Sequence, residues 1–231
     1  MQTWLLHLCD SLFPVGGFAF SDGLESAAAR HLIRDAGELG AWLDTVLDES
    51  VGRFEGPAVA LAWEAFANGR WDRLTTLDRE LVAMRAASAV RASSSAVGAR
   101  LLKTWHALYP DDRLARMQTL VERGVLWPAL PVVFGAACAS AGPATPGDPR
   151  SIDARGAVEA FAYTRLAATI SSAMRLIPLG QLEAHGLLAR ALERVGEVAA
   201  QAAGRDPESF APAMDISQMT HPYVHSRLFR S

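Results

Sequence analysis

The sequence predicts an all-α protein, and three observations support that prediction. The 231 residues include 42 Ala and 28 Leu but only 15 Val and 5 Ile, so strong helix formers outnumber the β-branched residues that strands favour. Hydrophobic residues make up 50% and charged residues 20% of the chain, as in globular proteins. Apolar residues recur at helical spacing through most of the sequence. We therefore expect a single-domain bundle of about eight to ten helices.

The first candidate helices follow acidic capping signals. Asp22 and Glu25 have the spacing of a capping box ahead of residues 27–32, and Asp35 and Glu38 repeat that spacing. The apolar residues after Asp35 lie on one face of a helix; they are Leu39, Trp42, Leu43, Val46 and Leu47. These two segments are therefore predicted as the first two helices.

The next helices are bounded by proline, glycine and aspartate. Pro57 is placed to open a helix that Asn68 and Gly69 close. Asp72 is placed to cap a further helical segment, whose pattern continues as far as Tyr109. We expect this stretch to form one long helix.

The second half of the chain contains four more candidate helices, separated by clear breaks. Residues 141–149 hold three Pro and two Gly and form a predicted loop. Pro178 should end or kink the helix before it. The candidate helices are residues 112–123, 129–140, 151–177 and 179–203.

Two segments lack a helical pattern. Residues 11–23 combine three Phe with Gly and Pro, and the residues from Arg205 onward contain three Pro yet remain apolar. We expect a helical domain over residues 1–204. Residues 205–231, called the C-terminal segment below, are expected to bind a partner and to pack on that domain or extend from it.

Charge and composition exclude several classes of function. The formal net charge is −3 and no basic stripe is present, which argues against nucleic-acid binding. The single lysine, Lys103, follows Leu102, so the chain has no phosphate-binding P-loop. No apolar run is long enough for a membrane span. The two cysteines do not form a disulfide framework, so we expect a cytoplasmic protein.

Recognisable catalytic motifs are absent, so we predict no catalytic or cofactor-binding residues. His221 and His225 have the spacing of two metal ligands on a helix, although Pro222 lies between them. They are weak candidates for a metal site. The alternative is that both are histidines without a ligand role.

Several residues are candidates for binding a partner protein. Phe13 and Phe18 flank two adjacent glycines and could face a partner or fill the core. Arg91 lies in a seam of small residues that could admit a second helix, or it could pair with carbonyls as a structural residue. Arg175 precedes Pro178 and could instead satisfy carbonyls at a helix end.

The C-terminal segment is unusual because it is apolar and ends with arginines beside aromatic and aliphatic residues. Such residues are typical of protein interfaces. We expect the segment to be loosely held in the free protein and to become ordered on a partner, with Phe229 as the apolar anchor; the alternative is that it packs on its own domain. Its candidate contacts are His221, Tyr223, Arg227, Leu228, Phe229 and Arg230.

Four blocks of the sequence together resemble the urease accessory protein F family. They are LCDSLFPVGGFAFSDGLE at residues 8–25, the seam from Arg91 to Gly98, RLIPLGQ at residues 175–181, and residues 215–231, which end in SRLFRS. The resemblance spans essentially the whole chain. Family members usually have His where Asp22 stands and Glu where Pro222 stands, so local contacts at these two positions are expected to differ.

The resemblance implies an all-α homodimer that is not an enzyme. Proteins of this family form a complex with urease accessory protein D, also called H, and with the GTPase accessory protein G. That complex delivers nickel to apo-urease, and the F protein is thought to recruit the GTPase and couple its GTP cycle to nickel release. The chain itself would bind no cofactor, and Gln181 in the third block joins the partner-binding candidates.

Two other classes of function remain open from the residues alone. One is a helical enzyme whose site is assembled from Arg91, Arg175 and the scattered histidines. The other is a nickel-binding metallochaperone that uses His221 and His225, with Cys9 as a further ligand. Neither is supported by a clustered set of His, Cys and carboxylate residues.

Overall fold

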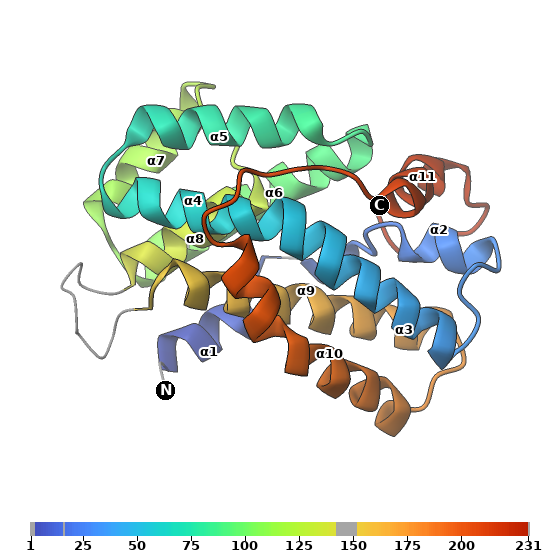
Figure 1. Ribbon diagram of the computed structural model, residues 1–231. Helices are drawn as coiled ribbons and strands as arrows, with labels where there is room; N and C mark the ends of the chain where they lie inside the picture. The colour runs from blue at the N-terminus through green and yellow to red at the C-terminus, as the bar shows by residue number, and fades with distance from the viewer. Residues whose placement is uncertain (1–2, 16, 142–151, 231) are drawn as a thin grey trace.

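The computed structural model describes residues 3–15, 17–141 and 152–230, and every regular element within them is helical (Figure 1). The all-α prediction is therefore confirmed. The α-helices are α1 (Thr3–Cys9), α2 (Leu24–Ala29), α3 (Ala36–Thr45), α4 (Gly56–Ala67), α5 (Trp71–Met84), α6 (Ser88–Leu108), α7 (Asp112–Glu122), α8 (Leu130–Ser140), α9 (Ala154–Leu176), α10 (Gln181–Ala202) and α11 (Pro212–Thr220). Short 3₁₀ turns are η1 (Gly17–Ala19) and η3 (His221–Tyr223).

A π-helical segment, η2 (Val46–Glu55), joins α3 to α4 without a break, because the flanking Thr45 and Gly56 also have helical backbone angles. When α3, η2 and α4 are counted as one continuous helix, the eleven α-helices of the described residues make ten separate helices. This agrees with the expected eight to ten. The predicted loop at residues 141–149 lies outside the described residues apart from Ala141.

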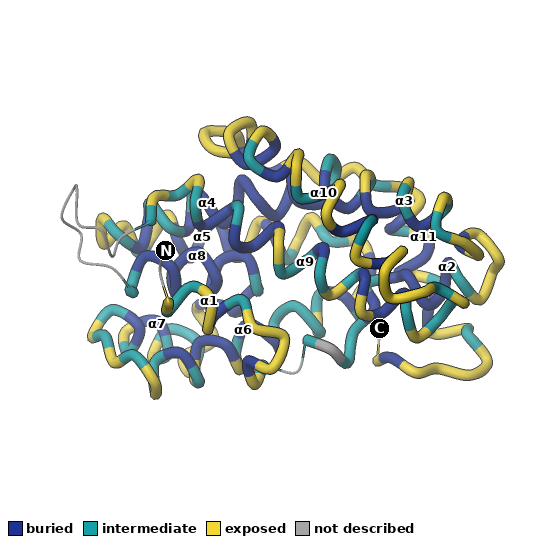
Figure 2. Tube along the Cα trace, turned by 90° about the horizontal axis from the view of Figure 1, so that it is seen from below, coloured by how far each residue is buried: buried dark blue, intermediate teal, exposed yellow. Residues whose placement is uncertain are grey.

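The core lies around α8, which packs against α4 and α6, while α9 packs against α4 and α10 (Figure 1). Almost the whole of α8 is buried, as expected for a helix that is apolar on all sides. Gly135 permits its close approach to α4, because a Cβ atom there would collide with the carbonyl oxygen of Val59. Figure 2 shows the buried positions running through the centre of the bundle and the exposed ones along its rim.

The two predicted capping boxes have different outcomes. Asp35 does cap α3, because its Oδ1 accepts the amide of Glu38 at 3.0 Å. The box at Asp22 is wrong, since Gly23 is the N-cap residue of α2 and the first-turn amide of Glu25 is accepted by Ser21 Oγ, at 3.4 Å, and not by Asp22. The carboxylates of Asp22 and Glu25 are used for contacts with distant parts of the chain instead.

The helix predicted to run from Asp72 to Tyr109 is in fact two helices, α5 and α6, with an extended break at residues 85–87. Arg91 stabilises the break, because its Nη1 donates to the carbonyl oxygens of Arg85 at 2.5 Å and Ala86 at 3.0 Å. Arg91 therefore pairs with carbonyl oxygens as a structural residue, which was the alternative to its binding a partner.

The small residues of α6 pack against the non-helical segment that precedes α8, and not against a second helix. A Cβ atom on Gly98 would collide with the carbonyl oxygen of Pro128, which lies just before α8. Ser95 donates its hydroxyl to the carbonyl oxygen of Trp127 at 3.1 Å, and Ser94 Oγ accepts the amide of Leu130 at 3.1 Å. The seam therefore fixes the chain that leads into α8.

Asp78 on α5 holds the same segment from its other side. Its Oδ2 accepts the amide of Trp127 at 2.5 Å and its Oδ1 accepts the amide of Ala129 at 2.8 Å. Burial raises the pKa of Asp78 above its ordinary value, although both amide donors oppose that rise. Among the described residues, no helix has the length and apolar character needed to cross a bilayer.

The substitution Asp78→Ala is expected to lower the free energy of unfolding by roughly 2–4 kcal/mol, because it leaves two amides at the start of α8 without acceptors. The matched control is Glu80→Ala, an exposed position in the interior of the same helix, which should change stability by less than about 0.5 kcal/mol. Urea unfolding followed by circular dichroism measures both. Equal stability of the two variants would contradict this role of Asp78.

Candidate functional site

Four charged side chains from distant parts of the sequence meet at a position where Glu55 is buried and the other three are partly buried. We call them the buried charge network: Asp22, Glu55, Arg85 and Arg165. Glu55 Oε2 accepts from Arg165 Nε at 2.9 Å, and its Oε1 accepts from Arg85 Nη2 at 2.5 Å. Asp22 Oδ2 accepts from Arg165 Nη2. Each charge therefore has a partner of opposite sign, as burial requires.

The π-helical geometry of η2 places Glu55 within this network. Gly56 donates its amide to the carbonyl oxygen of Val51, five residues earlier, and Ser50 Oγ donates to Glu55 Oε2 at 3.1 Å. Residues five apart lie about 140° apart around a regular α-helix. The wider turn of the π-helix brings Ser50 and Glu55 onto one side, where Ser50 donates to the carboxylate that Arg85 and Arg165 also contact.

Pro57 explains why the wide turn occurs here. Proline has no amide hydrogen, and its ring excludes the carbonyl four residues earlier from the α-helical ladder. That carbonyl belongs to Arg53, and it accepts the amide of Glu208 at 2.8 Å. The proline thus provides a backbone attachment point for the C-terminal segment.

Asp22 joins the network through a strained turn. It has a positive φ of 53°, which Asp tolerates better than most residues, and Gly23 follows with φ 90°. Its Oδ1 accepts from Gln218 Nε2 at 3.1 Å. Burial opposes the ionisation of Asp22, but the charges of Arg165 and Arg85 hold its pKa below the ordinary value. Burial likewise opposes the charged form of Arg165, yet Asp22 and Glu55 raise its pKa.

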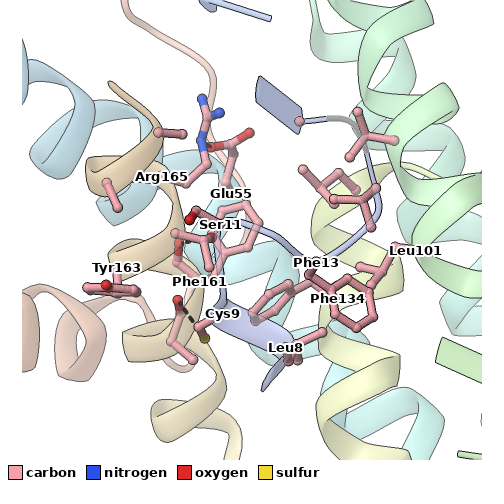
Figure 3. Close-up of a pocket in the computed structure, with 18 of the residues that line it drawn as sticks. Leu8, Cys9, Ser11, Phe13, Glu55, Leu101, Phe134, Phe161, Tyr163 and Arg165 are labelled. Atoms are coloured by element: carbon pink, nitrogen blue, oxygen red, sulfur yellow. Dashed lines mark hydrogen bonds and ion pairs between the residues drawn. The ribbon is translucent and has the colours of Figure 1, made fainter. Parts of the chain in front are cut away.

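A cavity of about 760 Å³ lies beside the network. Figure 3 shows Glu55 and Arg165 on one side of it and the apolar Phe13, Phe134 and Leu101 on the other. Cys9 also lines the cavity, and burial raises its pKa to about 12, so the thiol is protonated at neutral pH. The cavity therefore presents paired charges and apolar surface rather than an activated nucleophile.

The C-terminal segment is packed on the helical body, and Glu25 of α2 is the centre of that contact. The side chain of Glu25 accepts the amide of Leu228 at 2.5 Å and the amide of Phe229 at 3.3 Å. Nε2 of His221 lies 2.7 Å from its Oε2. Both Glu25 and His221 are buried, so each satisfies a polar group that would otherwise be costly to bury.

In this structure the C-terminal segment packs on its own domain, which is the alternative to a loosely held segment given in the sequence analysis. Phe229 is only 4% exposed, and the guanidinium of Arg175 lies 4.6 Å from the centroid of its ring. Arg230 donates its amide to the carbonyl oxygen of Ala19 at 2.8 Å. The segment is ordered because the body supplies both an apolar site for the ring and hydrogen-bond acceptors for the backbone.

The partner-binding candidates are divided between the interior and the surface. Phe13, His221 and Phe229 are buried, so in this structure they pack within the chain instead of forming the expected surface. Arg91 is partly exposed, and the side chain of Phe18 lies outside what the structure describes. The exposed candidates are Arg175, Gln181, Tyr223, Arg227, Leu228 and Arg230.

The structure does not bring the histidine candidates together as a metal site. His221 is buried against Glu25, whereas His225 is exposed. Within the described residues, no three His, Cys, Asp or Glu side chains are grouped so as to hold a metal ion. The arginines of the enzyme alternative are also engaged, Arg91 with carbonyl oxygens and Arg175 with the ring of Phe229.

The sequence analysis missed Glu25 as an anchor, and Glu55 and Arg165 as network residues. A detectable signal existed for two of them, because Glu55 and Arg165 each interrupt an otherwise apolar helical pattern. Glu25 gave no such signal, since an acidic residue near a helix start is already explained by capping.

The substitution Asp22→Asn is expected to lower the free energy of unfolding at neutral pH by roughly 2 kcal/mol, because it removes a charged partner of Arg165. The folded-state pKa of Asp22 lies below its unfolded value. Its stabilising contribution is therefore complete above about pH 5 and is lost as the pH falls through the folded pKa. The difference in stability between wild type and variant should therefore shrink as the pH falls from about 5 through the folded pKa, measured by urea unfolding across pH.

Asp44→Asn is the matched control, because Asp44 forms an exposed ion pair with Arg194. Its effect at neutral pH should be below about 1 kcal/mol. If the effect of Asp22→Asn stays constant from pH 7 down to the lowest pH at which both chains remain folded, ionised Asp22 does not contribute as described.

Comparisons with known proteins identify the family. The family model described as UreF matches residues 33–192. The urease accessory protein UreF of Dechloromonas aromatica is 32% identical, over 98% of this chain and 96% of that protein. The proteins of the same name from Nitrosococcus oceani and Paenarthrobacter aurescens are 31% and 30% identical, over 98% and 100% of this chain and 97% and 98% of their own lengths. This chain therefore belongs to the UreF family of urease accessory proteins.

Proposed function

We propose that this chain scaffolds the urease accessory complex, recruits the GTPase accessory protein G and couples its GTP cycle to nickel delivery into apo-urease. The observation that carries the proposal is the similarity to urease accessory proteins over nearly the whole chain. The protein takes part in urease maturation as an accessory protein and is not itself an enzyme. Nickel and GTP would be handled by the complex, with no cofactor bound by this chain.

The surface proposed to bind accessory protein D lies on α11 and the residues that follow it. Ile216, Met219 and Tyr223 are 53%, 54% and 86% exposed and recur at helical spacing. Leu228 is also exposed, and Arg227 precedes it. Exposed aromatic and aliphatic side chains beside arginine are typical of protein interfaces. Because the segment is already ordered, binding here would require little further loss of conformational entropy.

The proposal includes a two-fold homodimer in the cytoplasm, with accessory proteins D and G and apo-urease as partners. Nucleic acid and membranes are not among the proposed partners, in keeping with the net charge of −3. Both arginines of the buried charge network are paired with carboxylates. The network therefore offers no uncompensated positive charge for a nucleotide, which supports assigning GTP to the partner.

A double substitution, Tyr223→Ala with Leu228→Asp, is expected to reduce capture of accessory protein D at least tenfold, since it removes two exposed candidate contacts. Helical content should stay unchanged, because both side chains are exposed. The control is Val125→Asp, an exposed position just beyond α7, a helix that lies far from α11 in both overall views (Figures 1 and 2). Undiminished capture would place the contact with protein D elsewhere.

Binding of the GTPase is expected to depend on its nucleotide. A scaffold can shift the GTPase between states only if it binds one state more tightly than the other. Affinities measured by calorimetry for the GDP-bound and GTP-analogue-bound GTPase, with protein D present, should therefore differ by at least tenfold. Equal affinities would exclude coupling of the GTP cycle through this chain.

A further inference from the structure

Residues 222–228 form an exposed loop between two buried ends, and we call them the C-terminal loop. His221 before it is 1% exposed and Phe229 after it is 4% exposed, whereas every residue between them is exposed apart from the partly buried Val224. The loop carries Tyr223 and Leu228, two of the side chains proposed above to contact accessory protein D. Its ends are therefore fixed in the body while most of its side chains face solvent.

One carboxylate, that of Glu25 on α2, holds both ends of the C-terminal loop. Oε2 of Glu25 lies 2.7 Å from Nε2 of His221 and accepts the amide of Phe229 at 3.3 Å. Oε1 of Glu25 accepts the amide of Leu228 at 2.5 Å. An ionised carboxylate accepts at both oxygens and donates at neither, so Glu25 can bind all three donors at once. It thereby closes the loop across its base.

The exposed part of the C-terminal loop stands away from α2. A hollow of about 610 Å³ lies between them, lined on one side by Arg30 just after α2 and on the other by Tyr223 and His225. Within the loop, Val224 donates its amide to the carbonyl oxygen of His221 at 3.1 Å and closes the turn η3. The loop is therefore positioned from its base, with its exposed side chains held off the body.

We propose that Glu25 is a positioning residue for partner binding, which holds the C-terminal loop in the shape that accessory protein D recognises. Glu25 is only 3% exposed, so it acts through the loop and not by contact with the partner. A loop that is already fixed loses little conformational entropy on binding, and this raises affinity. The inference rests on the proposed function, because it takes protein D as the partner of this surface.

Glu25→Gln tests the role of the carboxylate in the full chain, because it exchanges an acceptor oxygen for an amide group that cannot accept. The affinity for protein D, measured by calorimetry, is expected to fall at least tenfold, the change that loss of a hydrogen bond to a charged group produces. Amide hydrogen exchange over residues 222–230, followed by mass spectrometry, should become faster by a similar factor. Exchange in α4 and α8 should stay unchanged, which shows that the body remains folded.

Two substitutions of His221 test the same contact from its other side. His221→Gln keeps a side-chain nitrogen that can donate to Glu25, and should retain the affinity for protein D within about threefold. His221→Leu fills similar space without a donor, and should lower the affinity at least tenfold and speed up exchange in the loop. If Glu25→Gln also loosens α4 and α8, this pair alone decides the proposal.

The control is Glu193→Gln, an exposed position on α10. It should change neither the affinity nor the exchange by more than about twofold. Faster exchange in the C-terminal loop with undiminished affinity would overturn the proposal, because protein D would then not depend on the shape of the loop. Unchanged exchange in His221→Leu would overturn it as well, since the contact with Glu25 would not hold the loop.

The double variant Tyr223→Ala with Leu228→Asp separates this inference from the proposed function. If the double variant loses capture of protein D while Glu25→Gln and His221→Leu keep their affinity, the proposed surface stands and only the positioning role of Glu25 fails. If all of these variants bind protein D normally, the proposed contact surface is wrong too.

Discussion

The largely buried position of Arg165 is the constraint on which much of this structure depends. A guanidinium cannot lose its protons at ordinary pH, so it must be surrounded by acceptors if it is to be buried. Asp22 and Glu55 supply these acceptors, and Arg85 pairs with the other carboxylate oxygen of Glu55. The charges of the network therefore compensate one another only when the four segments that carry them are all folded together.

Three of these parts reach the network through an interruption of regular helix, whereas Arg165 lies within α9. The π-helical turn before Pro57 orients Glu55, the break between α5 and α6 carries Arg85, and the left-handed turn at Asp22 and Gly23 starts α2. Such irregularities cost conformational energy, and they persist where surrounding contacts compensate for that cost. Their convergence at one cavity wall makes this region the main departure from a simple helical bundle.

Most of the fold was predictable from the sequence, because helical periodicity and caps such as Asp35 are local signals. The break at residues 85–87 was not, since the residues on both sides favour helix and only the carbonyl contacts of Arg91 reveal it. The buried charge network and the anchoring of the C-terminal segment could not be predicted from the sequence either. Glu25 and Asp22 act through residues about two hundred positions away, and no local pattern specifies which of many residues such a carboxylate will meet.

The separation between Glu25 and its partners has a consequence for biosynthesis. Leu228 and Phe229 follow Glu25 by 203 and 204 residues, whereas neighbouring helices such as α9 and α10 contact each other soon after both are made. Short-range contacts of this kind form early, and long-range ones wait for the intervening chain. Until the ribosome has released Phe229, Glu25 lacks its donors and the surface beneath α11 stays uncovered. A truncated product would keep that surface open to chaperones and proteases.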